Sequence, residues 1–566
     1  MSENEVLKTD VLIIGAGAAG ILAAIRAQAE GADVLLITSG ALGRDSSITW
    51  MAGGGLVAAF YPPDSPEAHA EDTIKRGRFL SDQELVLALL KQTPQNIMDL
   101  DRWGMRFRRR NDGRFEQGLL HGHSQHRGLL HKYDGEFLGR DYRNVLSKQV
   151  RRRGLKVVED CFITDLLTKD ERIVGAVGID IREGEFKVFR SKVTILATGG
   201  FPSCYKFYCS SPQSTGAGLG MAYRAGAEFV DMEFVNFYAN TGIWPPIFRG
   251  EIWPTVIRHF LSGIYLNKYG ISFWENYKRK GITGPQAIMQ EIREGRGTAH
   301  GGIYLSCIHL PENLLEDFYA AAGKVKWLKK LKKVGFDLSR KAVEICPTSL
   351  STLGGCKVDT RCKTNVPGLY AAGEIASGTD GAHTINGNQM AFSLTMGSLA
   401  GREAAKEAKE MRMEPSTDDR QVMYLKELAY APITNKAGVR PFELKSRIRE
   451  IMWEYANIVG RTEEGLLTAI DMIGQIRKEV PKLSSHARNR RFNLEWVECL
   501  EIDNMLTVCE MTIRSALTRK ESRGLHFRED FPQMFPEWLR NVIVRKQGDG
   551  MSIRTDPVTF SLIRPE

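Results

Sequence analysis

A glycine-rich stretch near the start of the chain most constrains what the protein can fold into. Thr9–Ile14 ends in a run of Val, Leu and Ile, which predicts a buried strand of a parallel sheet. Residues 21–30 have the pattern of a helix that stops at Gly31, and Val34–Ile37 read as a second buried strand. Strand, glycines, helix and strand follow within about 30 residues, which indicates a Rossmann-like βαβ unit.

The glycines between strand and helix have the spacing G-x-G-x-x-G. Gly15 allows a tight turn, Gly17 lets the backbone approach a pyrophosphate, and Gly20 lets the helix pack closely on the strand. Free N–H groups at the helix N-terminus suit a negative charge. The pattern predicts a dinucleotide site. A glycine-rich turn without a ligand is the alternative.

Length and composition bound the class of protein. At 566 residues the chain is long enough for two or three domains, and its 43% apolar and 26% charged residues are typical of a soluble globular protein. The apolar stretch 11–25 contains three glycines and is too short to span a membrane. The acidic N-terminus does not resemble a signal peptide, so we expect a cytoplasmic protein.

Neither cysteines nor histidines have the spacing of a metal site. The nine cysteines include no C-x-x-C pair, so we expect free thiols and neither zinc nor an iron–sulfur cluster in this chain. Four histidines between His121 and His131 fit no regular ligand helix, so we predict no metal there.

The net charge of +9 comes with basic clusters at 106–110, 151–153 and 326–333. Clusters of this kind are usually solvated faces, and an acidic partner or a membrane surface is the alternative. No nucleic-acid-binding motif accompanies them, so we expect no nucleic acid partner.

Small residues recur where the backbone of a nucleotide-binding fold passes its ligand. The loop 38–55 after the second strand is rich in Ser, Thr and Gly, and Val193–Leu196 runs into Ala-Thr-Gly-Gly. Thr38 and Ser39 stand where such folds usually place an acid for ribose hydroxyls, and they offer weaker hydroxyl contacts. Residues 65–73 and 82–100 read as amphipathic helices.

These motifs, taken in order, resemble a known family. They are G-A-G-A-A-G at 15–20, A-T-G-G at 197–200, the segment 214–234 and G-L-Y-A-A-G-E at 368–374. They resemble the flavoprotein subunit of succinate dehydrogenase and fumarate reductase, whose superfamily includes L-aspartate oxidase and the flavin subunit of adenylylsulfate reductase. Residues 461–466 and 519–532 resemble that family's C-terminal helical domain.

The resemblance implies an α/β fold with a Rossmann-like FAD-binding domain in two parts, residues 1–235 and 345–410. An α+β capping domain, 236–344, is inserted between them, and a C-terminal helical domain covers 411–566. FAD is the implied cofactor, with Glu374 on its ribitol or ribose hydroxyls, and the substrate meets the flavin between the FAD-binding and capping domains. The expected FAD-binding residues are Gly15, Gly17, Ala18, Ala19, Gly20, Thr38, Ser39, Ser46, Ser47, Thr49, Gly53, Gly54, Ala197, Thr198, Gly199, Gly373, Glu374, Asn388, Gln389 and Met390.

The chain departs from the family at the flavin attachment point. Many members that act on succinate or fumarate attach FAD to a histidine in the sequence S-H-T. Here the matching residues are Ser47, Ile48 and Thr49, and an aliphatic side chain forms no such bond. The resemblance therefore implies non-covalent FAD.

The chain also departs from the family at four positions that bind a small dicarboxylate. Neutral residues replace the family's histidines and arginines at Tyr238, Gln286, Leu350 and Thr384. A dianion would be unpaired in a cleft of low dielectric constant and would bind poorly. We therefore expect a substrate other than succinate or fumarate, in a neutral and partly aromatic cleft lined by Tyr238, Trp244, Gln286, Leu350, His383 and Asn386.

The candidate catalytic residues are Tyr238, Arg258, His259 and His383, with Arg258 and His259 of the cap as a replacement cation or acid. The alternatives are that Tyr238 and Trp244 are packing residues and that His383 only forms a hydrogen bond with the flavin.

The expected function is that of an FAD-dependent oxidoreductase subunit that acts on a small molecule and exchanges electrons with an iron–sulfur protein. Such a complex can lie at a membrane through a partner. The alternatives are a non-catalytic electron-relay subunit, an L-aspartate oxidase-like enzyme and an adenylylsulfate reductase-like enzyme.

Overall fold

The computed structural model describes residues 6–44, 47–52, 55–131, 138–252, 262–280, 282–321, 329, 331–412 and 415–565. Its largest sheet has the strand order β6-β2-β1-β9-β8-β7, and β16 also pairs with β9. Strand β1 lies between β2 and β9 and is parallel to both. The strands are β1 (Val6–Ile14), β2 (Val34–Ile37), β6 (Lys156–Val158), β7 (Cys161–Lys169), β8 (Arg172–Asp180), β9 (Glu185–Leu196) and β16 (Leu369–Ala371).

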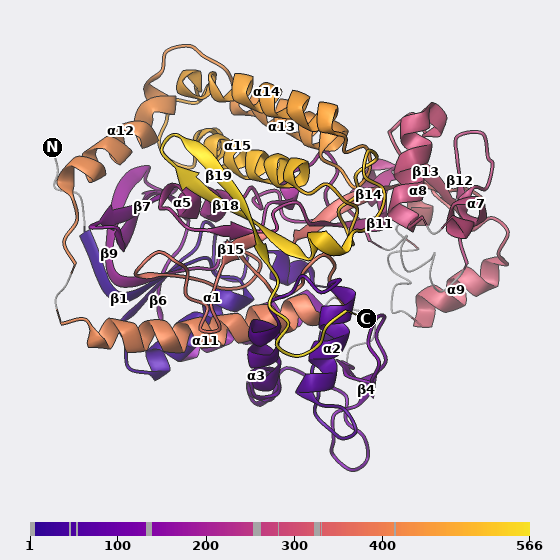
Figure 1. The fold of residues 1–566 in the computed structure, drawn as a ribbon, viewed down its shortest axis with the longest axis horizontal. Helices are drawn as coiled ribbons and strands as arrows, with labels where there is room; N and C mark the ends of the chain where they lie inside the picture. The colour runs from indigo at the N-terminus through magenta and orange to yellow at the C-terminus, as the bar shows by residue number, and fades with distance from the viewer. Residues whose placement is uncertain are drawn as a thin grey trace.

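Helices α1 (Ala18–Ala29) and α11 (Asn388–Glu410) pack together beside this sheet (Figure 1). Glycine allows their backbones to touch, because a Cβ atom on Gly397 would lie 2.2 Å from the carbonyl oxygen of Ala19. Helix α11 follows the sequence motifs of the second FAD-binding part, so this contact joins two segments far apart in the chain. The other elements of the FAD-binding region are α2 (Pro66–Arg76), α3 (Gln83–Arg102), α4 (Leu138–Arg152), α5 (Ala217–Arg224) and the short strands β3 (Leu56–Val57), β4 (Gln117–Gly118) and β5 (Gly128–Leu129).

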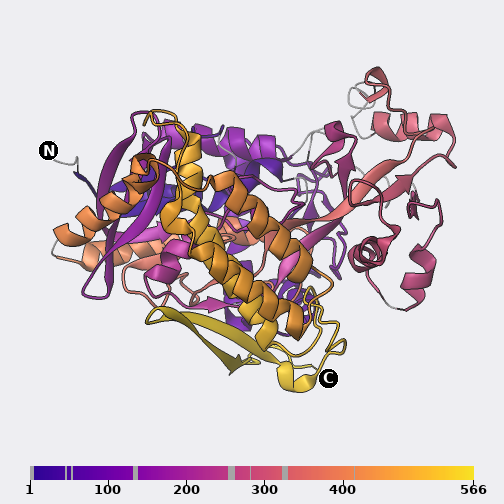
Figure 2. The same ribbon diagram turned by 90° about the horizontal axis from the view of Figure 1, so that it is seen from above.

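A second, antiparallel sheet has the order β11-β14-β13-β12 and projects to one side of the molecule (Figures 1 and 2). Phe248, Tyr265 and Ile345 belong to its own apolar core. The elements are β11 (Val235–Trp244), β12 (Ile264–Leu266), β13 (Ile303–Ser306), β14 (Val343–Thr352), α7 (Trp274–Arg279), α8 (Gly284–Glu291) and α9 (Glu312–Ala321).

The C-terminal region is helical and then ends in a hairpin of strands. Figure 2 shows its long helices crossing the molecule above the large sheet. The hairpin β18–β19 pairs with β10, in the sheet order β17-β15-β10-β18-β19, so the last part of the chain is not entirely helical. The elements are α12 (Asp419–Thr434), α13 (Pro441–Tyr455), α14 (Glu463–Arg477), α15 (Leu494–Thr518), β10 (Phe229–Val230), β15 (Gly355–Lys357), β17 (Ala376–Ser377), β18 (Arg540–Gln547) and β19 (Gly550–Pro557).

All nine cysteines are free and buried. Among the described residues, no three His, Cys, Asp or Glu side chains are placed to hold a metal ion. In the same part of the chain, each helix is too short or too polar to cross a membrane.

Candidate functional site

A cavity of about 1850 Å³ lies between the large sheet and the antiparallel sheet. Its walls come from the β1–α1 turn, the ends of β2, β9 and β16, the facing strands β11 and β14, and the start of α11. Pockets for small molecules typically measure about 300–1,000 Å³. This cavity therefore has room for a dinucleotide and a second molecule.

The structure brings most of the predicted FAD-binding residues to this cavity from six separate segments. Ser46, Gly53 and Gly54 lie outside the described residues. Gly20 and Asn388 are described but do not line the cavity. Those that line it are Gly15, Gly17, Ala18, Ala19, Thr38, Ser39, Ser47, Thr49, Ala197, Thr198, Gly199, Gly373, Glu374, Gln389 and Met390.

The glycine turn has no space for side chains. Gly15 has φ +108°, and a Cβ atom there would lie 2.3 Å from the carbonyl oxygen of Ala197. A Cβ atom on Gly20 would lie 1.8 Å from the carbonyl oxygen of Gly15, which explains its place behind the cavity wall. Gly15 and Gly20 thus allow the tight turn and the close packing that their spacing predicts, and Gly17 forms part of the cavity wall.

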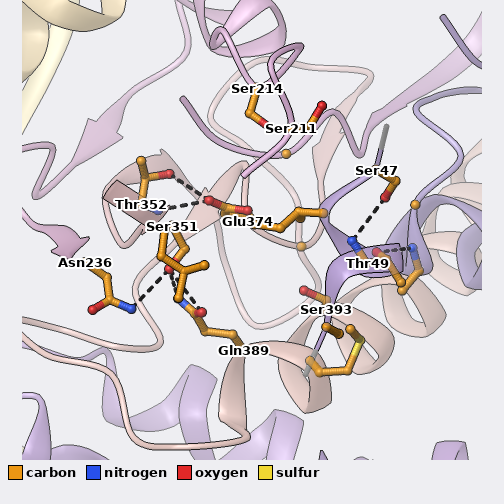
Figure 3. A pocket seen from close by; sticks show the side chains of 18 of the residues that line it. Ser47, Thr49, Ser211, Ser214, Asn236, Ser351, Thr352, Glu374, Gln389 and Ser393 are labelled. Carbon is orange, nitrogen blue, oxygen red and sulfur yellow. Dashed lines mark hydrogen bonds between the residues drawn. The ribbon is translucent and has the colours of Figure 1, made fainter. Parts of the chain in front are cut away.

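Polar groups beside this turn fit FAD. Thr49 Oγ1 accepts a hydrogen bond from the N–H of Ala18 at 3.1 Å, and Ser47 Oγ accepts one from Thr49 N at 3.3 Å (Figure 3). Gly17, the N-cap of α1, has no side chain, so apart from the bond between Ala18 and Thr49 this helix end suits a pyrophosphate. Among the described residues, the buried Oγ1 of Thr198 has no hydrogen-bond partner. A bound ligand with polar edges would satisfy it.

Glu374 points across the cavity toward Thr352 (Figure 3). Its Oε1 accepts a hydrogen bond from Thr352 N at 2.9 Å. Burial raises the pKa of Glu374 to about 7, against the hydrogen bonds from Thr352 that lower it. A half-protonated carboxyl group both donates and accepts, which suits contacts with the hydroxyls of a ribose or ribitol.

The start of α11 contributes two neighbouring amides with different environments. Gln389 lines the cavity, and its side chain is hydrogen-bonded to Ser351 Oγ, which also accepts from Asn236 Nδ2 at 3.4 Å (Figure 3). Asn388 is instead fully buried, with its amide bonded to His69 Nε2 at 2.8 Å and to Thr73 Oγ1 at 2.9 Å. The side chain of Asn388 therefore anchors α11 and does not reach the cavity.

The part of the cavity next to the antiparallel sheet contains most of the residues expected in the substrate cleft. Tyr238, Gln286, Leu350, His383 and Asn386 all line it. Trp244 does not, because its ring is 40% exposed and stacks on His300 at 4.0 Å. The expectation that Trp244 lines the cleft is therefore wrong.

Two of these residues have defined polar roles. Burial raises the pKa of Tyr238, with a further contribution from Cys209, so its hydroxyl keeps its proton and can donate a hydrogen bond. Gln286 stands where the family has an arginine, and its Oε1 accepts from Thr283 N at 3.0 Å and Thr283 Oγ1 at 2.8 Å. Gln286 thus caps the N-terminus of α8 instead of presenting a charge.

His383 lies beside an arginine that the sequence patterns did not single out. Its Nε2 is 3.0 Å from a guanidinium nitrogen of Arg76, and its Nδ1 is 2.9 Å from the carbonyl oxygen of Thr384. Burial, and then the charge of Arg76, lower the pKa of His383 to about 4, so the imidazole is neutral at pH 7. The candidates Arg258 and His259 lie outside the described residues.

Arg76 and Arg78 both line the cavity, so its lining is not neutral as expected. Their sequence signal is ambiguous, because basic residues in the last turn of a helix are common on account of the helix dipole. Only the packing of the end of α2 beside residues 380–384 shows that they face the cavity: the N–H of Ala382 donates to the carbonyl oxygen of Gly77 at 2.9 Å.

Comparisons with known proteins identify the family of the chain and its FAD-binding domain. The family model for an FAD binding domain matches residues 10–390, and the model for the fumarate reductase flavoprotein C-terminus matches residues 445–566. A relative from Methanothermobacter marburgensis, named as a subunit of fumarate reductase (CoM/CoB), is 34% identical over 96% of this chain and 98% of its own length.

Two more similarities span nearly the whole chain. The 8-methylmenaquinol:fumarate reductase flavoprotein subunit of Wolinella succinogenes is 30% identical over 92% of this chain and 86% of its own length. The solved structure of Mycobacterium smegmatis Sdh1 in complex with UQ1 has a TM-score of 0.89 at 28% identity, over 99% of this chain and 96% of the other.

Proposed function

Because the chain belongs to the succinate dehydrogenase and fumarate reductase family of flavoproteins, we propose that it is a non-covalent FAD enzyme whose substrate is neither succinate nor fumarate. Its class is that of the family, an FAD-dependent oxidoreductase. When bound, FAD supplies the two-electron chemistry with the substrate and one-electron exchange with a partner.

The side chain of Ile48 supports a non-covalent cofactor. It lies in the cavity wall between Ser47 and Thr49, at the first residue of the short helix η1 (Ile48–Met51). Its hydrocarbon carries no nucleophilic atom to which a flavin could be joined. Holding FAD then depends on the glycine turn, the open end of α1 and the hydroxyls of Ser47, Thr49 and Thr198.

The proposal on the substrate rests on four uncharged side chains in the cavity wall. Tyr238, Gln286, Leu350 and Thr384 all line the cavity at positions matched to the family's dicarboxylate-binding residues, and none of the four carries a positive charge. Two carboxylates close together need compensation at both ends in a site of low dielectric constant. The chain's own contribution to the reaction is to hold and orient the substrate and to donate a hydrogen bond from Tyr238.

Fumarate reduction is the competing assignment, because two relatives that span nearly the whole chain are named as fumarate reductases. A third assignment, an electron relay without a substrate, is less favoured because side chains do not fill the cavity beside Tyr238 and His383. The same relatives are named as subunits, which supports our proposal of a partner. We propose an iron–sulfur protein in that role. A cytoplasmic location stays a prediction from the sequence.

Two measurements on the native complex test these proposals. In a denaturing gel, the band of this chain should show no flavin fluorescence, whereas a fluorescent band would refute non-covalent FAD. With a reduced viologen dye as electron donor, fumarate should be turned over at least about 100-fold more slowly than by a fumarate reductase assayed alongside. Rapid turnover of fumarate would make the competing assignment correct. Co-purification of a brown cluster protein tests the partner.

A further inference from the structure

The end of helix α2 places two arginines in the wall of the cavity. Arg76 is the last residue of α2 and is half-buried, and Arg78 is exposed one residue beyond Gly77. Both line the cavity, as do Thr379, His383 and Asn386, and Arg76 contacts His383 directly. The family-like positions already described do not include either arginine.

Hydrogen bonds orient the guanidinium group of Arg76. Its Nε donates to the carbonyl oxygen of Thr384 at 3.3 Å, and one terminal nitrogen lies 3.0 Å from His383 Nε2. A carbonyl oxygen only accepts and a guanidinium only donates, so His383 must carry its proton on Nδ1 and accept at Nε2. His383 therefore positions Arg76 and adds no charge of its own.

The charges of Arg76 and Arg78 are not compensated within the described part of the chain, where neither forms an ion pair. The charged group that acts on Arg76 is Arg78, and burial together with this like charge lowers the pKa of Arg76. Asp380 also lines the cavity, but it accepts from Thr379 Oγ1 at 3.2 Å and is not ion-paired with either arginine.

Another arginine of this protein, Arg127, has its charge neutralised by ion pairs. Arg127 is completely buried and forms ion pairs with Asp64 at 2.7 Å and with Asp72 at 2.5 Å. It also contacts a histidine, His123, at 3.2 Å, as Arg76 contacts His383. The two arginine–histidine pairs differ in that only Arg127 has carboxylate partners.

The backbone that presents Arg78 is strained. Arg78 and the next residue, Phe79, have φ values of +54° and +63°, a backbone conformation that residues with side chains rarely adopt. The C-terminal region holds this turn, because Arg523 donates a hydrogen bond to the carbonyl oxygen of Arg78 at 3.2 Å. Strain of this kind persists where the surrounding structure imposes it, and it gathers at ligand sites.

We propose that Arg76 and Arg78 form a subsite for an oxyanion of the substrate, a carboxylate, sulfonate or phosphate. Guanidinium groups bind such anions through charge-assisted hydrogen bonds. The subsite rests on the proposed function and deepens it: the substrate is anionic at the end held by Arg76 and Arg78 and uncharged where it meets Tyr238, Gln286 and Leu350.

The test is anion binding to the FAD-loaded protein at constant ionic strength. Acetate, methanesulfonate and inorganic phosphate are titrated separately by calorimetry into the wild type and the variants Arg76→Gln and Arg78→Gln. Loss of a charge-assisted bond should weaken the binding anion about 10-fold or more for Arg76→Gln, and less for the exposed Arg78. The anion that binds tightest to the wild type identifies the chemical group.

Lys75→Gln is the matched control. Lys75 precedes Arg76 in the same turn, is 59% exposed and pairs with Glu71 instead of lining the cavity, so the same loss of charge should leave anion binding unchanged. Equal weakening in Lys75→Gln, or unchanged binding in both arginine variants, would overturn the proposal, as would failure of all three anions to bind.

Folding is checked by the unfolding temperature and FAD content of each variant. If Arg76→Gln does not fold, Arg78→Gln and Arg76→Lys keep the proposal testable. These binding data are independent of the denaturing gel and of the fumarate assay, so the subsite and the proposed function can fail separately.

Discussion

The two halves of the cavity are built in different ways. The cofactor half is made of backbone and small side chains, and it is so tight that a Cβ atom on Gly20 would lie 1.8 Å from the carbonyl oxygen of Gly15. The substrate half is made of longer side chains such as Tyr238, Gln286 and Arg76, which come from separate segments. A wall of backbone tolerates almost no change, whereas a wall of side chains can change its chemistry one residue at a time.

We propose that this difference lets the chain keep the cofactor motifs of the family while the residues at the positions matched to dicarboxylate binding are neutral. A substitution in the glycine turn disturbs the packing of α1 on β1, so it affects both fold and cofactor. A substitution such as the family's arginine to Gln286 changes only the charge at the wall, because Gln286 finds local hydrogen bonds with Thr283. Four experiments test or sharpen this comparison.

The largest effect is expected in the glycine turn. Gly20→Ala places a methyl group 1.8 Å from a backbone oxygen, so the protein should be recovered without FAD or not folded. Absorbance of FAD per mole of purified protein measures this. The control is Gly474→Ala in α14, where the new methyl group would lie in open space. It should retain FAD and gain about 0.4–1 kcal/mol of stability. An FAD-replete Gly20→Ala protein would contradict the comparison.

The next largest effect is a difference in stability between variants of two arginines, Arg127, which supports the fold, and Arg76, which lines the cavity. Arg127→Met leaves Asp64 and Asp72 without their buried partner, so the free energy of unfolding should fall by about 3–5 kcal/mol. Arg76→Met removes a charge that has no described ion pair, so stability should change by about 1 kcal/mol or less. Urea unfolding measures both. Equal losses would show that Arg76 serves the fold and not a ligand.

Glu374 should make stability depend on pH in protein stripped of FAD. The folded state keeps its proton up to about pH 7, whereas the unfolded chain loses it near 4.5. The folded state thus binds more protons between these values, and the free energy of unfolding should fall as the pH rises from about 4.5 to 7, by on the order of 3 kcal/mol. In the Glu374→Gln variant, the urea concentration at the midpoint of unfolding should change little with pH between 4.5 and 7. Parallel curves for the two proteins would contradict the raised pKa.

The smallest expected effect is that of pH on anion binding, which should be absent between about pH 5.5 and 8. His383 has a pKa lowered to about 4, so it is neutral throughout pH 5.5–8 and contributes no charge to anion binding, while both arginines stay charged. The affinity for methanesulfonate, which is itself ionised throughout this range, should therefore be flat. If affinity fell about 10-fold between pH 5.5 and 7.5, His383 would be a cation and the inferred tautomer would be wrong.

The sequence predicted the cofactor half well because its physical requirements are local. The G-x-G-x-x-G spacing and the apolar runs beside it correspond to β1, α1 and β2. Ala197, Gly373 and Glu374 were found through motifs with little freedom of sequence. Asn388 was misplaced because adjacent residues at the start of a helix point in different directions. The pattern does not show which of the two amides, Asn388 or Gln389, faces the cavity.

The substrate half was predicted less completely, because its residues meet only through tertiary packing. Trp244 lies on the same strand as Tyr238, yet it stacks on His300 outside the cavity. Arg76 and Arg78 resemble the ordinary basic end of a helix until residues 380–384 and Arg523 are placed against them. The C-terminal hairpin β18–β19 was also missed, since its partner β10 is about 300 residues away in the chain.

By itself, the sequence determined the family, the cofactor and the neutral residues at the four dicarboxylate positions, because each depends on residue type at a short spacing. Only the tertiary structure decided which charges enter the cavity. The charge of an arginine becomes available to a ligand when no carboxylate is placed to pair with it, and that depends on how distant segments pack.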